Sequence, residues 1–160
     1  MSLGYLTHVL IATDGSAQSI EAARFLRTLV PPRSLGRITV LAVIRSLAST
    51  PFFAQAEAVG VFPFPGEALE ELEESASIAA EQSARNVLEE VADLAHETQI
   101  MIRRGSAADE IVHAAEELRA NLIVIGSRGW GTVRSVFLGS VSERVLHSAH
   151  CAVLVVRPTH

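Results

Sequence analysis

The chain has 160 residues, and 49% of them are hydrophobic, which suits one domain with a sizeable apolar core and does not suit a disordered chain. The formal net charge of −5 argues against a nucleic-acid partner held through its phosphates. No apolar run reaches the roughly 18 residues of a membrane span, and the start of the chain does not resemble a signal peptide. A single cysteine excludes an intramolecular disulfide. We therefore expect a cytoplasmic protein without a membrane partner.

Apolar runs that suit buried strands alternate along the chain with segments of helical periodicity. Residues 8–13 form the first such run. Asp14-Gly15-Ser16 interrupts it, with Ser16 as a helix N-cap, and the apolar spacing then predicts a helix that ends before Pro31. Residues 37–44 are rich in β-branched side chains, which predicts the second strand.

A segment rich in phenylalanine and proline follows the second strand. We expect residues 47–66 to be irregular, as an insertion in the fold. The helical pattern returns from Glu67 to about Glu97, and its glutamate-rich face indicates a solvated helix surface. The third strand is predicted over Gln99 to Arg103.

The last third of the chain predicts two more helices and two more strands. Ser106 and Asp109 resemble a capping box at the start of a helix, and residues 122–125 form the fourth strand. The fourth helix is expected from Val141 to about Ser148, and the fifth strand over residues 152–156.

This alternation predicts one α/β domain over residues 1–160. Its expected architecture is a single open five-stranded parallel sheet with helices on both faces. Ligands of such sheets bind beyond the carboxyl ends of the strands, where the strand order reverses. The loops after strands one and four carry the most unusual residues, and an order of 3-2-1-4-5 would make these two strands neighbours.

The loop after the fourth strand is the strongest functional signal in the sequence. It reads Gly126-Ser127-Arg128-Gly129 and continues, after nine residues, to Gly139-Ser140 at the start of a helix. Glycines allow a tight turn and close approach to a ligand, and a helix N-terminus favours phosphate. The loop is therefore interpreted either as a phosphate cradle or as an ordinary strand-to-helix connection.

Two further residues keep alternative roles at this stage. Ser140 begins a Ser-Val-Ser-Glu capping box, and its hydroxyl could equally face a ligand. Asp14 ends the first strand and is either a turn residue or a ligand for a ribose hydroxyl or a hydrated metal. Arg128 is better placed than Arg134 to meet a phosphate, although either could lie on the surface.

All 13 residues counted as lysine or arginine are arginines. A Walker A loop requires a lysine, so a P-loop ATPase is excluded. A Gly-x-Ser-x-Gly nucleophile elbow is also absent, and no pair of carboxylates is suitably placed for acid–base chemistry. These absences favour a binding protein over an enzyme.

The long glycine motif resembles that of the ATP-binding branch of the universal stress protein family. Two other segments are similar to the same family: the apolar strand at the end, and Val9-Leu10-Ile11-Ala12-Thr13-Asp14-Gly15-Ser16. The similarity runs from His8 to Val156. It implies a Rossmann-like sheet of the adenine nucleotide α-hydrolase type, with ATP and Mg²⁺ as ligands and the metal bridging phosphate oxygens.

The resemblance also implies the residues of the nucleotide site. Asp14 would bind the ribose, with Ala12 and Thr13 beside the nucleotide, and Val43 would contact adenine through its backbone. The ribose and phosphates would be wrapped by the glycine loop and met by the following helix, through Gly126, Ser127, Arg128, Gly129, Gly139, Ser140, Val141 and Ser142.

The resemblance further implies a homodimer, formed by antiparallel pairing of the last strand through Val153, Leu154, Val155 and Val156. An apolar strand at a sheet edge would otherwise be a liability. The function expected is an ATP-binding dimeric switch in the stress response, with an unknown protein partner. The alternatives are a scaffold of the same family that binds no nucleotide, or an α/β enzyme that uses a nucleotide or a flavin. We also hypothesise that residues 47–66 partly cover the ligand or the dimer surface.

Overall fold

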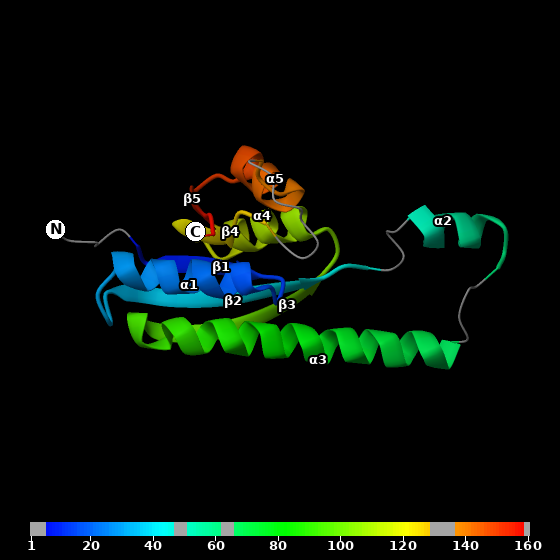
Figure 1. The fold of residues 1–160 in the computed structure, drawn as a ribbon, viewed down its shortest axis with the longest axis horizontal. Coiled ribbons are helices and arrows are strands. Elements are labelled where there is room, and N and C mark those ends of the chain that lie inside the picture. Colours follow the sequence, from blue (N-terminus) through cyan, green and yellow to red (C-terminus); the bar gives the residue numbers. More distant parts are fainter. Residues whose placement is uncertain (1–5, 47–50, 62–65, 129–136, 159–160) are drawn as a thin grey trace.

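The computed structural model describes residues 6–46, 51–61, 66–128 and 137–158 (Figure 1). Five strands form one parallel sheet in the order β3-β2-β1-β4-β5, which confirms the predicted topology. The elements in chain order are β1 (His8–Thr13), α1 (Ala17–Leu29), β2 (Leu35–Ile44), α2 (Pro51–Ala58), α3 (Gly66–Val91), the 3₁₀ helix η2 (Ala92–Leu94), β3 (Ala95–Arg104), α4 (Ala107–Glu117), β4 (Leu122–Gly126), α5 (Ser140–Ser148) and β5 (Ala152–Val156). No helix among the described residues is long and apolar enough to cross a bilayer.

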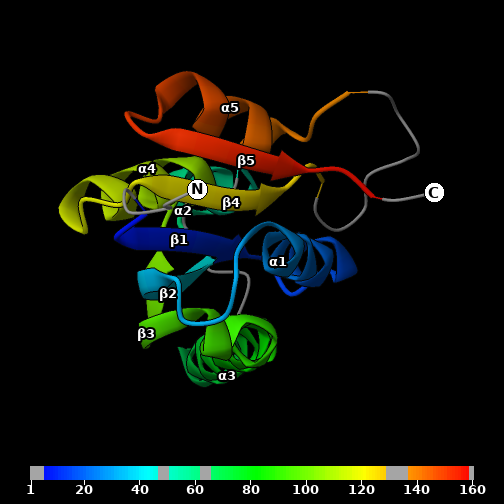
Figure 2. The same ribbon diagram turned by 90° about the vertical axis from the view of Figure 1, so that its left-hand side faces the viewer.

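Helices cover both faces of the sheet (Figure 2). Because side chains of a strand alternate between the two faces, Val9 and Ile11 pack under α1 and α3, whereas Leu10 and Ala12 pack under α4 and α5. The central strand β1 is buried along its whole length, as a parallel strand covered on both faces should be.

Two predicted boundaries around α3 are wrong. The helix ends at Val91 and not near Glu97, and β3 begins at Ala95 and not at Gln99. Residues 95–104 pair with β2 from Leu35 to Ile44, so the backbone hydrogen bonds of a long neighbouring strand extend β3 backwards into residues of helical pattern. The second strand likewise begins two residues earlier than expected, at Leu35.

The expectation of an irregular segment over residues 47–66 is also wrong in part, because Pro51–Ala58 forms the helix α2. Proline fits the first turn of a helix, where its missing N–H group would have had no partner within the helix. Figure 1 shows α2 standing apart from the sheet, and residues 47–50 and 62–65 lie outside the described part of the chain.

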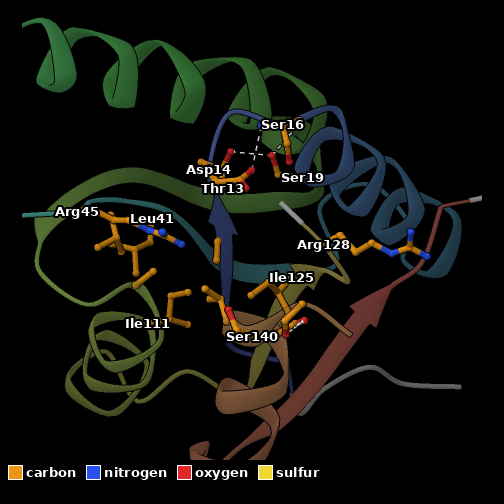
Figure 3. Close-up of a pocket in the computed structure, with 17 residues that line it drawn as sticks. Thr13, Asp14, Ser16, Ser19, Leu41, Arg45, Ile111, Ile125, Arg128 and Ser140 are labelled. Atoms are coloured by element: carbon orange, nitrogen blue, oxygen red, sulfur yellow. Dashed lines mark hydrogen bonds between the residues drawn. The ribbon is translucent and has the colours of Figure 1, made fainter. Parts of the chain in front are cut away.

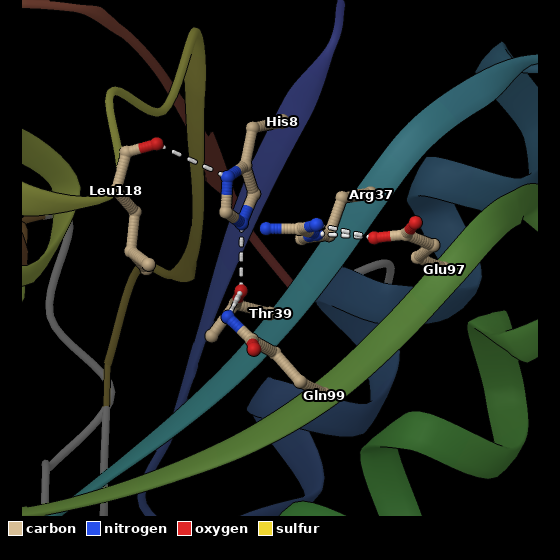
Figure 4. A network of polar contacts seen from close by, with 6 residues as sticks. All are labelled: His8, Arg37, Thr39, Glu97, Gln99 and Leu118. Carbon is tan, nitrogen blue, oxygen red and sulfur yellow. Dashed lines mark hydrogen bonds and ion pairs between the residues drawn. The ribbon is translucent and has the colours of Figure 1, made fainter.

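A buried polar network crosses the amino-terminal side of the sheet (Figure 4). His8 Nδ1 lies 3.1 Å from the Leu118 carbonyl oxygen, and Nε2 lies 2.7 Å from Thr39 Oγ1. A carbonyl can only accept, so Nδ1 carries a proton, and in the neutral ring Nε2 accepts from the Thr39 hydroxyl. Gln99 Nε2 donates to the same hydroxyl oxygen over 2.8 Å. The network therefore satisfies both ring nitrogens of a neutral His8.

The free energy of unfolding should depend on pH because His8 is part of this network. Burial, reinforced by the nearby Arg37, lowers the pKa of His8, and the Leu118 carbonyl opposes this only in part. The unfolded chain therefore takes up a proton near pH 6.5 that the folded chain resists. The free energy of unfolding should fall as the pH falls from 7.5 through 6.5, and should level off below the lowered pKa of His8.

Denaturant titrations of the wild type and of His8→Gln across this range would measure the effect. The other histidines are common to both proteins, so the difference isolates His8. Equal dependence on pH in the two proteins would contradict the prediction.

Candidate functional site

A cavity of about 450 Å³ opens beyond the carboxyl ends of β1, β2 and β4 (Figure 3). This volume is within the usual range for small-molecule sites, and the position is the one expected for ligands of an open parallel sheet. The lining consists of Ala12, Thr13, Asp14, Ser16, Ser19, Leu41, Val43, Arg45, Ala107, Ile111, Ile125, Gly126, Arg128, Gly139, Ser140, Val141 and Ser142.

The fold brings nearly all the predicted nucleotide residues to this cavity. Ser127 is not among the lining residues and is buried, at 2% exposure. Gly129 and Arg134 lie outside the described residues. Residues separated by more than a hundred positions thus meet because β1 and β4 are neighbours.

The wall after β1 is held by local hydrogen bonds. Asp14 Oδ1 accepts from the Ser16 backbone N–H over 2.9 Å, and the Gly15 N–H donates to Thr13 Oγ1 over 3.1 Å. Gly15 has a φ of 80°, which glycine adopts without strain. Thr13 Oγ1 donates to Ser19 Oγ, which donates to the Ser16 carbonyl. These contacts fix the turn that carries Asp14 at the cavity edge.

The two described ends of the glycine loop make close backbone contacts with their surroundings. A Cβ on Gly126 would lie 3.2 Å from the backbone of Gln18 in α1. A Cβ on Gly139 would lie 3.1 Å from the Ser127 carbonyl oxygen, which also accepts the Gly139 N–H over 2.7 Å. A side chain at either position would therefore force the neighbouring backbone to shift by a few tenths of an ångström.

The start of α5 differs from the predicted capping box. Gly139 occupies the N-cap position, so Ser140 is the first residue of the helix, and no side chain caps the turn. Instead the Ser142 hydroxyl lies 3.0 Å from the Ser127 carbonyl oxygen and 2.9 Å from that of Gly139. Ser142 thereby ties the helix to the end of β4, while Ser140 and Val141 face the cavity.

Side-chain caps are also missing from the other two helices that begin at this edge. Ser16 and Ser106 stand at the N-cap positions of α1 and α4, but neither side chain makes the predicted capping bond. Ser16 Oγ is buried and has no partner within the described residues, although Ser16 lines the cavity. A buried hydroxyl normally has a partner, and a bound ligand could supply one.

Several residues that line the cavity near β2 and α4 were not predicted from the sequence. Leu41 and Arg45 share a face of the chain with the predicted Val43, and the period of two along a strand could have indicated them. Ala107 and Ile111 come from the first turns of α4, where no ligand-binding motif marks them. Figure 3 shows the Arg45 side chain directed into the cavity and the Arg128 side chain directed away from it.

Comparisons with known proteins agree with this fold. The universal stress protein family model matches residues 6–157. Universal stress protein MJ0531 of Methanocaldococcus jannaschii is 33% identical over 156 residues, with 93% of this chain and 81% of the relative covered. Universal stress protein YxiE of Bacillus subtilis is 28% identical, with 93% and 97% covered.

Solved structures show the same fold. The structure of the M. jannaschii protein MJ0577 matches with a TM-score of 0.75 at 24% identity, over 97% of this chain and 98% of the other. A universal stress protein in complex with cAMP matches at 0.60 and 20% identity, over 96% and 98%. An Arabidopsis thaliana family protein with AMP bound matches at 0.59 and 16% identity, over 96% and 92%. The family model over residues 6–157, together with 33% identity to MJ0531 over 93% of this chain, establishes that the chain belongs to the universal stress protein family.

Proposed function

We propose that the chain binds ATP in this cavity and acts as a dimeric regulatory switch in the stress response, and not as an enzyme. The observation that carries the proposal is the meeting of Asp14, after β1, with the N-terminus of α5 across a loop whose glycines permit close approach. A helix N-terminus supplies unpaired N–H groups and a positive dipole end for phosphate.

The chemistry of the lining suggests how the nucleotide would lie. Leu41, Val43 and Ile111 make the end near β2 apolar, which suits a base. Asp14 stands at the middle strand, where its carboxylate would accept from ribose hydroxyls. The phosphates would reach the amides of Ser140 and Val141, with the glycine loop wrapped around them. The relatives crystallised with AMP and cAMP support an adenine nucleotide as the ligand class.

The residues present fit a Mg²⁺ ion that would accompany the phosphates: Asp14 would help to hold it, and it would neutralise phosphate charge. Magnesium commonly takes one or two protein carboxylates and completes its shell with phosphate oxygens and water. Asp14 is the one carboxylate among the lining residues described, and no group of three potential metal ligands occurs in the described part of the chain. Bound metal would therefore enter with the nucleotide, to neutralise its charge.

The dimer is proposed to form through β5, an edge strand of the sheet. Val153, Leu154 and Val155 are only half-buried in the single chain, and antiparallel pairing with a second copy would cover them and satisfy the open edge. The Ser127 N–H donates to the Val156 carbonyl over 2.8 Å, so the glycine loop and β5 are in direct contact. A change in nucleotide occupancy would thus reach the dimer interface.

Ligand release from freshly purified protein tests the proposal. Acid extraction followed by absorbance and mass measurement should yield ATP or ADP, and light scattering should give twice the chain mass of 17.1 kDa. Protein that carries nothing is titrated with MgATP by calorimetry. Absence of ATP binding would leave the scaffold alternative, a flavin spectrum would indicate an enzyme, and a monomer would contradict the dimeric switch.

A further inference from the structure

Four apolar side chains and one arginine form a slot at the β2 end of the cavity. Leu41 and Val43 lie on one face of β2, and Arg45 continues the same alternation just beyond the strand. Ala107 and Ile111 lie one helical turn apart on α4 and line the same cavity. Figure 3 shows Leu41, Arg45 and Ile111 grouped on the side opposite Arg128.

The Arg45 guanidinium is available to a ligand. Arg45 makes no hydrogen bond or ion pair with another described residue, whereas Arg37, on the same strand, pairs with Glu97. Its side chain is exposed and is directed into the cavity (Figure 3). Arg128, the cation expected from the sequence, points the other way.

The slot is far from the end of the cavity that suits phosphate. Strands of a sheet lie about 4.8 Å apart, so the carboxyl ends of β2 and β4, with β1 between them, are separated by about 10 Å. A nucleotide whose phosphates lie at the N-terminus of α5 would therefore place its base, and not its phosphates, beside Arg45. A guanidinium is planar and weakly hydrated, and it stacks well on aromatic rings.

We infer that Arg45 is a specificity-determining residue that closes the slot by stacking its guanidinium on the face of the bound base. The inference rests on the proposed nucleotide function and goes beyond it by assigning the arginine to the base and not to the phosphates. Apolar contacts from β2 and α4 hold one side of the ring, and Arg45 covers the open side. Purines, with the larger π-face, gain more from this contact than pyrimidines.

The test compares ATP and AMP, which share a base and differ in phosphate charge. Affinities are measured by calorimetry for the wild type, Arg45→Ala, Arg45→Lys and the control Arg85→Ala. Arg85 lies on α3, on the other face of the sheet, in an exposed pair with Glu81, and its removal changes the net charge equally. Circular dichroism confirms that each variant is folded.

We expect Arg45→Ala to weaken ATP and AMP binding by the same factor, about 5- to 30-fold, because the lost contact is with the base. Arg45→Lys should resemble Arg45→Ala, because an ammonium has no planar face, and Arg85→Ala should bind as the wild type does. The inference is overturned if ATP is weakened much more than AMP, if lysine restores wild-type affinity, or if Arg45→Ala binds unchanged. Failure of the wild type and of Arg85→Ala to bind any nucleotide would instead reject the proposed function, and the inference with it.

Discussion

Replacement of Gly139 by valine is expected to weaken ATP binding by about 30- to 100-fold, the loss of one or two hydrogen bonds to a charged phosphate. The added Cβ would lie 3.1 Å from the Ser127 carbonyl oxygen, a backbone atom that cannot rotate away as a side chain can. Relief of this contact must shift the first turn of α5, whose amides are proposed to meet the phosphates.

Gly66→Val is the matched control for this variant. Gly66 stands at the start of α3, and a Cβ there would have nothing within 4 Å among the described residues. Calorimetry with MgATP should give wild-type affinity for Gly66→Val, and thermal unfolding should show that both variants are folded. Wild-type ATP affinity in a folded Gly139→Val protein would reject the proposed role of the α5 N-terminus.

Replacement of Gly36 by alanine should lower the free energy of unfolding by about 2–3 kcal/mol, in the upper part of the range for overpacked sites. The new Cβ would lie 2.5 Å from the Thr7 carbonyl oxygen. Thr7 cannot retreat easily, because Asn121 Oδ1 accepts from its backbone N–H over 2.9 Å and from its hydroxyl over 2.7 Å. The Arg37 N–H also donates to the same Thr7 carbonyl over 2.8 Å.

Urea unfolding of Gly36→Ala and Gly66→Ala would measure this effect. The Gly66 variant should be as stable as the wild type or more stable, because alanine reduces the freedom of the unfolded chain at a position without steric conflict. ATP affinity should change little in Gly36→Ala under conditions where the protein is folded, because Gly36 lies at the opposite end of the sheet from the cavity. Equal stability of the two variants would show that the backbone at Thr7 adjusts freely.

The strand order could be predicted from sequence because two independent signals agree. The first signal is the short apolar run, such as residues 8–13, which is typical of a buried strand. The second is the expectation that Asp14 and the glycine loop share one ligand, which requires β1 and β4 to be neighbours. The boundary between α3 and β3 could not be predicted, because residues 95–98 keep a helical pattern and become a strand through pairing with β2. Tertiary hydrogen bonding outweighs local propensity there.

The lining of the cavity could be predicted where its residues belong to a sequence motif. It could not be predicted where apolar residues without a motif complete the wall. Glycine and aspartate are common turn residues, so Gly126, Gly139 and Asp14 could be predicted only because they belong to a long motif that resembles a known family. Ile111 and Ala107 look like any apolar positions of an amphipathic helix, and only the packing of α4 beside β2 brings them to the site. The predicted cap at Ser140 failed by one position, because the sequence pattern does not reveal that Gly139 bonds to Ser127.

The position of the cavity also has a consequence for stability. Paired residues join β1 to β4 over Val9–Ile11 and Leu122–Val124, a much shorter seam than the one that joins β2 to β3 from Leu35 to Ile44. A ligand that touches Val43 and Asp14 on one side and Ser140 on the other spans this seam. Such a ligand would add contacts across the strand pair with the fewest paired residues, and its binding would raise the free energy of unfolding.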